Sequence, residues 1–168
     1  LYTLDLARNE PHQRTSGDWE VSSPQALRDG SGFYFIANRE QPGEYELYRL
    51  QLDGNAESLP LLRALNGVME FTAAADDSRV LLRYSGSYLP PQLAMLDVGT
   101  RATTRLTDIR TAAYRALSWQ QPQLVTIPSQ HDAGQAIWSK LYLPDLKQHP
   151  GPRPVVMFVH GAGYTQNT

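Results

Sequence analysis

The chain has 168 residues, of which 41% are hydrophobic and 19% are charged, so it holds enough apolar material for a globular core. Its formal net charge of −2 gives no electrostatic reason to expect a nucleic acid or an anionic membrane as a partner. The absence of cysteine excludes disulfides, thiol catalysis and zinc sites built on cysteine.

A strand-like hexapeptide recurs three times in the first hundred residues. Its copies read Leu-Tyr-Thr-Leu-Asp-Leu, Leu-Tyr-Arg-Leu-Gln-Leu and Leu-Ala-Met-Leu-Asp-Val, and they begin at residues 1, 47 and 93, a spacing of 46 residues both times. Apolar residues alternate within each copy, as in a strand with one buried face. Thr15 and Thr107 also correspond, since each lies fourteen residues after the start of its copy. Because the chain opens directly on the first copy, we expect no secretory signal in this stretch.

Two acidic turns each lead into a further β-rich run. The turns are residues 29–31 and 76–78, and the runs are residues 33–36 and 80–82. Residues 19–21 and 68–71 precede them and are expected to form strands as well. These segments lie one residue outside the 46-residue register, which an insertion in a loop explains.

A period in the forties with about four short strands per repeat is typical of a β-propeller blade. We predict one blade in residues 16–63 and another in residues 64–108, with residues 1–15 closing an earlier blade. The alternative is an unrelated β-sandwich whose similar strands recur by chance.

The pattern changes after Asp108, and very little helix is expected. Five apolar residues, 155–159, predict a strand buried on both faces, and a corner with uncovered backbone N–H groups follows at residues 160–163. The alternative is a buried strand that ends in an ordinary glycine turn. Before that strand, residues 112–119, 123–127 and 135–143 are strand-like, and residues 144–154 form a linker rich in proline and polar residues.

Together these features resemble the prolyl oligopeptidase (S9) family of serine peptidases, in which a β-propeller covers an α/β-hydrolase domain. The resemblance rests on the three repeat strands, on Leu-Tyr-Leu-Pro at residues 141–144 and on residues 154–166. It implies a mainly β chain, with four-stranded blades in residues 1–108 and the first strands of an α/β-hydrolase domain in residues 109–168. The residues 163–166, Gly-Tyr-Thr-Gln, look more like the dipeptidyl-peptidase-IV-like branch.

The resemblance also implies that the parent protein hydrolyses peptide bonds with a serine nucleophile. No Gly-x-Ser-x-Gly elbow occurs in these residues, so we expect this stretch to be a piece of a larger chain and to be inactive alone. The corner is the only functional site of the family that has a counterpart in these residues. The resemblance implies that the side chain of His160, or the backbone N–H groups of Gly161, Ala162 and Gly163, would donate a hydrogen bond to the oxyanion. In the dipeptidyl-peptidase branch a tyrosine stands where this chain has His160.

The implied partners are a peptide substrate and the remainder of the propeller and hydrolase domain, with no nucleic acid, membrane, metal or cofactor. The sequence is compatible with an oligomer and does not choose a compartment. Two other functions stay open. One is a non-catalytic propeller that serves as a binding module; the other is an α/β-hydrolase esterase or lipase with a β extension.

The remaining polar candidates have simpler interpretations. Adjacent residues of a strand or turn point apart, so His131 and Asp132 are expected to belong to a turn rather than to a catalytic pair. Asp76 and Asp77 lack a regular series of oxygen ligands and are expected to form a turn rather than a calcium site. His12 and His149 are expected to be solvated in polar loops. Arg39 with Glu40, and Arg83, are expected near strand ends, where a propeller could present them to a substrate.

Overall fold

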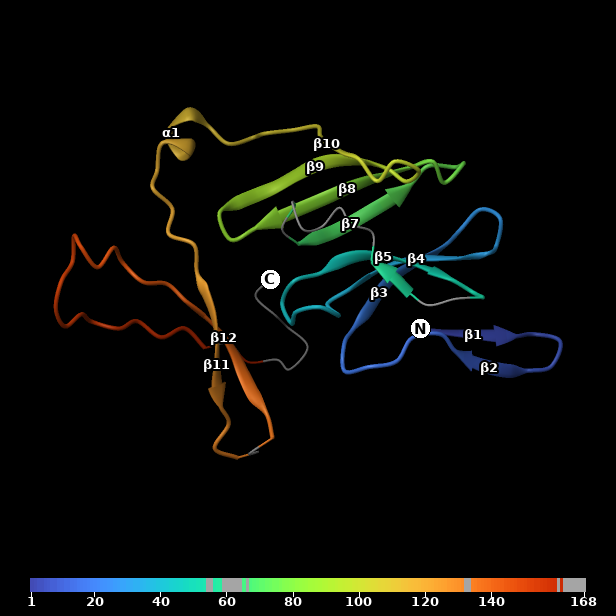
Figure 1. Cartoon of the computed structure of the whole chain (residues 1–168), viewed down its shortest axis with the longest axis horizontal. Coiled ribbons are helices and arrows are strands. Elements are labelled where there is room, and N and C mark those ends of the chain that lie inside the picture. Colours follow the sequence, from blue (N-terminus) through green and yellow to red (C-terminus); the bar gives the residue numbers. More distant parts are fainter. Residues whose placement is uncertain (54–55, 59–64, 66, 132–133, 160, 162–168) are drawn as a thin grey trace. The chain divides into compact units, whose positions relative to one another are not determined.

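A computed structural model describes residues 1–53, 56–58, 65, 67–131, 134–159 and 161 of the chain. In this part of the chain the regular structure consists of twelve strands and one short helix, which confirms the prediction of a mainly β protein with very little helix (Figure 1). The chain forms two units that divide after Arg110.

The first unit contains two four-stranded antiparallel sheets of the same topology. In each sheet the strands are hydrogen-bonded in chain order, as in a meander. The first sheet consists of β3 (Val21–Ala26), β4 (Gly32–Ala37), β5 (Glu46–Gln51) and β6 (Ala56–Ser58). The second sheet consists of β7 (Val68–Ala73), β8 (Arg79–Gly86), β9 (Leu89–Asp97) and β10 (Thr103–Arg105). The sheets fall inside the ranges predicted for two blades, while the domain boundaries themselves stay a prediction.

The acidic turns open the second strand of each sheet, as the sequence predicted. Asp29 Oδ1 accepts the N–H of Ser31 at 2.8 Å, and Asp76 Oδ1 accepts the N–H of Ser78 at 3.1 Å. The strand before the first turn was predicted wrongly. Strand β3 begins at Val21 rather than at Trp19, because the Trp19 ring packs against the sheet instead of extending it.

The corresponding threonines of the repeat, Thr15 and Thr107, each hydrogen-bond the first residue of a repeat strand. The N–H of Leu93 donates to Thr107 Oγ1 at 2.8 Å, and the amino group of Leu1 contacts Thr15 Oγ1 at 2.5 Å. Both threonines therefore hold the start of their repeat strand in the same way. In the first copy the paired strands are β1 (Tyr2–Asp5) and β2 (Glu10–Gln13), which form a separate antiparallel hairpin.

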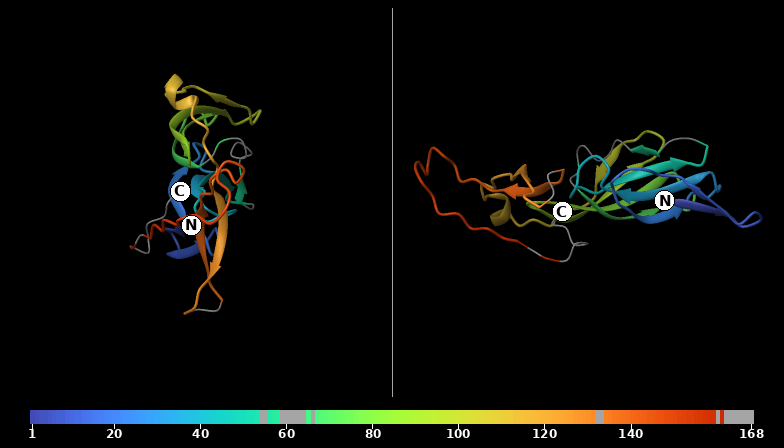
Figure 2. Two further views of the ribbon diagram at one scale, coloured as in Figure 1. Left: turned by 90° about the vertical axis from the view of Figure 1, so that its left-hand side faces the viewer. Right: turned by 90° about the horizontal axis from the view of Figure 1, so that it is seen from below.

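The two sheets pack face to face through a continuous apolar cluster. In Figure 1 and in the left-hand view of Figure 2, the second sheet, the first sheet and the hairpin β1–β2 follow one another in that order. The Tyr34 ring meets Phe71 of the second sheet edge-on, with ring centres 6.2 Å apart. The buried side chains of this cluster are Leu27, Tyr34, Ile36, Leu47, Val68, Val80, Leu82 and Leu96.

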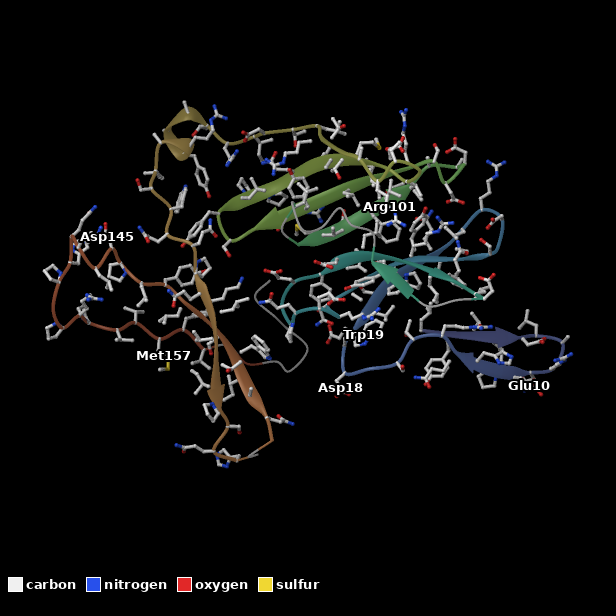
Figure 3. All side chains as sticks on the ribbon, in the orientation of Figure 1. Glu10, Asp18, Trp19, Arg101, Asp145 and Met157 are labelled. Atoms are coloured by element: carbon white, nitrogen blue, oxygen red, sulfur yellow. The ribbon has the colours of Figure 1, made fainter. Side chains whose placement is uncertain are left out.

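The opposite face of the first sheet holds an aromatic stack. Phe35 lies parallel to Tyr48, with ring centres 5.5 Å apart and planes 14° apart. Trp19, labelled in Figure 3, stacks on Phe35 at 6.4 Å. Leu1 and Val21 also pack against this cluster. The first sheet is therefore buried on both faces, with Tyr34 in one cluster and Trp19 and Tyr48 in the other.

The aromatic stack makes the fold sensitive to alkali. Burial, followed by the negative charges of Glu46 and Glu40, raises the pKa of Tyr48 from 10.0 to about 12. The unfolded chain therefore loses this proton at a lower pH than the folded chain does. The raised pKa means that the protonated Tyr48 side chain stabilises the folded state. We expect this contribution to the free energy of unfolding to be complete below pH 10 and to disappear as the pH rises to about 12.

The measurement is the midpoint of urea unfolding across this pH range, compared with Tyr48→Phe. The phenylalanine variant should lose less stability between pH 10 and 12, because it has no phenol to ionise. Tyr2→Phe, at a residue that is 64% exposed, is the matched control and should behave as the parent. The prediction would be contradicted if the parent, Tyr48→Phe and Tyr2→Phe proteins all lost the same stability between pH 10 and 12.

A hydrogen-bonded contact between turns also joins the two sheets. The N–H of Arg28 donates to Asp77 Oδ2 at 2.6 Å, and its guanidinium donates to the carbonyl of Ala75 at 2.6 Å. Asp77 has φ +54°, in the position that Gly30 occupies, with φ +71°, in the first turn. Asp77 therefore occupies, in a left-handed backbone conformation, the position that glycine occupies in the first turn. Its carboxylate accepts a hydrogen bond from Arg28 of the neighbouring sheet.

We expect Asp77→Ala to lower the free energy of unfolding by about 1–2 kcal/mol, from the left-handed backbone and the lost hydrogen bond together. Asp77→Asn should cost about half as much or less, since asparagine tolerates this backbone and keeps a side-chain oxygen as acceptor. Urea unfolding of both variants measures the difference. If Asp77→Ala lowered the free energy of unfolding no more than Asp77→Asn does, the contact between Asp77 and Arg28 would not contribute to stability.

The second unit contains a two-stranded hairpin and one short helix. Strands β11 (Gln123–Pro128) and β12 (Ala136–Leu141) form where strands were predicted, and they pair with each other. The strand predicted over residues 112–119 is wrong, because α1 (Ala112–Arg115) begins there. Thr111 caps this helix by accepting the N–H of Tyr114 at 3.1 Å. Among the described residues no helix has the length and hydropathy needed to cross a bilayer.

Candidate functional site

The apolar run before the predicted oxyanion corner is not a strand in this structure. Residues 155–159 belong to no sheet, and their side chains are 77–96% exposed. The prediction of a strand buried on both faces is therefore wrong for this part of the chain. A buried strand needs hydrogen-bonded neighbours, and the described strands β11 and β12 pair only with each other. Met157, labelled in Figure 3, is 80% exposed in this run.

Only Gly161 of the predicted corner can be placed. His160, Ala162 and Gly163 lie outside the described residues. Gly161 is exposed, and a Cβ added to it would meet no heavy atom within 4 Å. The role of the corner as an oxyanion donor stays a prediction.

The other histidines lie on the surface and apart from one another along the chain. His131 is exposed, and its backbone N–H donates to Ser129 Oγ at 3.3 Å in the turn between β11 and β12. His149 is exposed in the linker, where its N–H donates to the carbonyl of Asp145 at 2.9 Å. His12 lies in strand β2 opposite Thr3, not in a loop as predicted. Asp132 lies outside the described residues.

The aspartate pair of the second sheet forms a turn, as predicted. Asp76 accepts hydrogen bonds from the hydroxyl and N–H of Ser78, and these hydrogen bonds lower its pKa. Asp77 is engaged by Arg28 of the first sheet. No group of three or more potential metal ligands occurs among the residues that the structure describes.

Arg83 lies in the middle of β8 and not near a strand end, so its predicted position is wrong. Its Nε donates to Glu70 Oε2 at 2.9 Å, and a second guanidinium nitrogen contacts Glu70 Oε1. This bidentate pair lowers the pKa of Glu70 and raises that of Arg83. The prediction missed Glu70 as its partner; opposite charges on consecutive strands, thirteen residues apart, were the available signal. Arg39 instead lies 3.8 Å from its neighbour Glu40.

A shallow depression of 550 Å³ lies beside the acidic turn of the first sheet. Hydrogen bonds from the hydroxyl and N–H of Ser31 lower the pKa of Asp29 there. Small-molecule sites are usually enclosed and largely apolar. This depression is open and mostly charged or polar, so it does not have the character of a substrate pocket; its lining residues are Asp29, Ser31, Arg49, Gln51, Leu52 and Asp53.

Comparison with known proteins places the repeat in one family. The family model described as the dipeptidyl peptidase IV (DPP IV) N-terminal region matches residues 1–91. A probable dipeptidyl-aminopeptidase B of Emericella nidulans is 36% identical over 106 residues, which are 61% of this chain and 12% of that protein. Its counterpart in Coccidioides posadasii is 34% identical over 94 residues, 54% of this chain and 10% of that protein.

The fold is shared with a solved structure. The crystal structure of Porphyromonas gingivalis dipeptidyl peptidase 4 superimposes with a TM-score of 0.63 at 18% identity, covering 83% of this chain and 19% of that one. The chain thus spans about a tenth of the length of the curated relatives it matches.

Proposed function

The chain belongs to the family of dipeptidyl peptidase IV N-terminal regions, and from that membership we propose that it is part of a serine peptidase that hydrolyses peptide bonds of short peptides. The observation that carries the proposal is the match over residues 1–91, which spans the hairpin β1–β2, the first sheet and the start of the second. The relatives named dipeptidyl-aminopeptidase B support cleavage near the amino terminus of the substrate.

Within this enzyme, we assign residues 1–108 to the propeller and residues 109–168 to the start of the α/β-hydrolase domain. The change from four-stranded sheets to a separate unit after Arg110 supports this division. The propeller part would control how substrates reach the catalytic centre and would not itself perform chemistry. The serine, aspartate and histidine of catalysis would come from other residues of the protein.

The corner at His160 and Gly161 would supply a hydrogen-bond donor to the oxyanion of the tetrahedral intermediate. Preset donors act on charge that develops only during the reaction, so such a group changes the catalytic rate more than substrate binding. The His-Gly-x-Gly sequence at residues 160–163 supports this role.

The test is to incubate the intact protein that contains this chain with a peptide whose amino terminus is free, and with the same peptide acetylated. Mass spectrometry should detect a released dipeptide from the free peptide alone, and a fluorophosphonate should abolish its release. Cleavage of simple esters without peptide cleavage would indicate an esterase instead. A protein that cleaves neither and is not labelled by the fluorophosphonate would fit a non-catalytic propeller.

A further inference from the structure

A polar side chain interrupts the buried face of strand β9. Ala94 and Leu96 of this face are 0% exposed, and Gln92 continues the face with an exposed fraction of 2%. Gln92 lies opposite the buried Tyr84 of β8. Burial of an amide costs free energy unless its oxygen and nitrogen find hydrogen-bond partners. Gln92 therefore indicates a local requirement that an apolar residue could not meet.

The amide of Gln92 holds the segment that follows the last strand of the second sheet. Gln92 Oε1 accepts the hydroxyl of Thr107 at 2.8 Å and the N–H of Ile109 at 3.1 Å. Gln92 Nε2 donates to the carbonyl of Pro90 at 3.1 Å, which keeps the amide oxygen directed toward the segment. Because the Ile109 side chain is 63% exposed, the hydrogen bond rather than apolar burial attaches this residue to the sheet.

The preceding repeat has different residues at these positions. Glu46 and Leu61 stand 46 residues before Gln92 and Thr107, so the earlier repeat has neither the amide nor the hydroxyl there. Glu46 is also only partly buried, whereas Gln92 is buried. The buried amide at this position thus belongs to the sheet from which the chain continues into the second unit.

The connection between the two units is very short. The first unit ends at Arg110, and Thr111 of the second unit already caps α1. Since Gln92 holds Ile109, a single residue separates the last anchored residue of the sheet from the helix cap. Without Gln92 the last anchor would be Thr107, which also bonds within the sheet. The connection between the anchors would then lengthen by two residues, or about 7 Å when extended.

We propose that Gln92 is a positioning residue, which binds the exit segment (residues 107–109) to the second sheet and so fixes where the second unit begins. This role rests on the proposed function, in which residues 1–108 control how a peptide reaches the catalytic centre. A shorter connection restricts the second unit to fewer placements relative to the first. Catalysis depends steeply on the alignment of substrate and reacting groups. Gln92 acts through the exit segment and not on the substrate itself.

The first experiment measures the anchor by hydrogen exchange in the intact protein, and it needs no activity. Gln92→Met keeps an unbranched side chain of similar volume but removes the acceptor. We expect the N–H of Ile109 to exchange at least ~10-fold faster in this variant, while the amides of β8 and β9 keep their rates. Gln92→Glu retains an acceptor oxygen in either protonation state and should keep the slow exchange.

Asn38→Leu is the matched control for the loss of a buried amide. Asn38 is 6% exposed, and its Oδ1 accepts the N–H of Glu20 at 2.7 Å beside the first sheet. This variant should leave the exchange of Ile109 unchanged. Unchanged exchange in Gln92→Met, or equal acceleration in Asn38→Leu, would overturn the anchor.

The second experiment separates positioning from general damage to the enzyme. A fluorophosphonate reports the reactivity of the serine in the hydrolase domain of the proposed enzyme, whereas dipeptide release also requires the propeller part to direct the substrate. In Gln92→Met we expect kcat/KM for dipeptide release to fall at least ~5-fold, with the rate of fluorophosphonate labelling within about twofold of the parent. Gln92→Glu and Asn38→Leu should keep both rates.

Equal falls in labelling and in dipeptide release would indicate damage to the catalytic centre and would overturn the positioning role. Faster exchange of Ile109 with unchanged dipeptide release would overturn it as well, because the anchor would then have no effect on catalysis. A parent protein that is neither labelled nor active on peptides would contradict the proposed function and the positioning role together, while the exchange result would still decide whether Gln92 anchors the exit segment.

Discussion

Replacing Phe35 by alanine is expected to lower the free energy of unfolding by about 3–5 kcal/mol. Phe35 is 0% exposed, and its ring contacts the rings of Trp19 and Tyr48, whose planes are within 15° of its own. Truncation removes the apolar surface buried by the ring and leaves a cavity that the stacked neighbours cannot fill without moving. The measurement is urea unfolding of the intact protein at neutral pH.

Two further variants separate the stack from a general loss of aromatic surface. Phe35→Leu keeps most of the volume and should cost less than half as much. Tyr2→Ala removes an aromatic ring that is 64% exposed and should change stability by no more than about 0.5 kcal/mol. If Phe35→Ala cost no more than Tyr2→Ala, the stack would not be part of the core.

The sequence predicted those parts of the fold that have a clear local apolar pattern. Strands β5 and β9 lie in the alternating hexapeptides, and β4 and β8 lie in the apolar runs that follow the two acidic turns. The start of β3 was missed, since Ser23 and Pro24 are poor strand formers and Trp19 looked more suitable. Ser23 has φ +51° within an irregular part of this strand, which no periodic pattern reveals.

The errors in the second unit have a different cause. In residues 112–119 the capping by Thr111 outweighed the strand-like composition and produced one turn of helix. Residues 155–159 have the composition of a buried strand, but composition does not supply the neighbours with which a strand pairs.

Side-chain contacts between strands and between sheets were the least predictable feature of the candidate sites. The hydrogen bond from Arg28 to Asp77 joins residues 49 positions apart, and the Glu70–Arg83 pair depends on the register of β7 against β8. Register follows from which face is buried, so it becomes visible only when the packing of the sheets is known. The corner at His160 rests on its sequence motif and on family resemblance, and it therefore requires a kinetic test.

For the proposed peptidase activity, replacing His160 by alanine in the intact protein is expected to lower kcat for peptide hydrolysis by about 10²–10³-fold, with little change in KM. The reason is that an oxyanion donor binds charge that is present in the transition state and absent from the bound substrate. His149→Ala is the matched control, because His149 is an exposed linker histidine, and it should leave both constants unchanged. Steady-state kinetics with a fluorogenic dipeptide substrate measures both.

A third variant distinguishes donation by the side chain from donation by the backbone. In His160→Tyr a hydroxyl replaces the imidazole N–H, and a tyrosine occupies this position in the branch that the sequence resembles. If the side chain donates, the tyrosine variant should keep kcat within about tenfold of the parent, well above the alanine variant. If alanine and tyrosine both retain full activity, the donor is the backbone around Gly161. A rise in KM at constant kcat would instead place His160 in substrate binding and contradict its role toward the oxyanion.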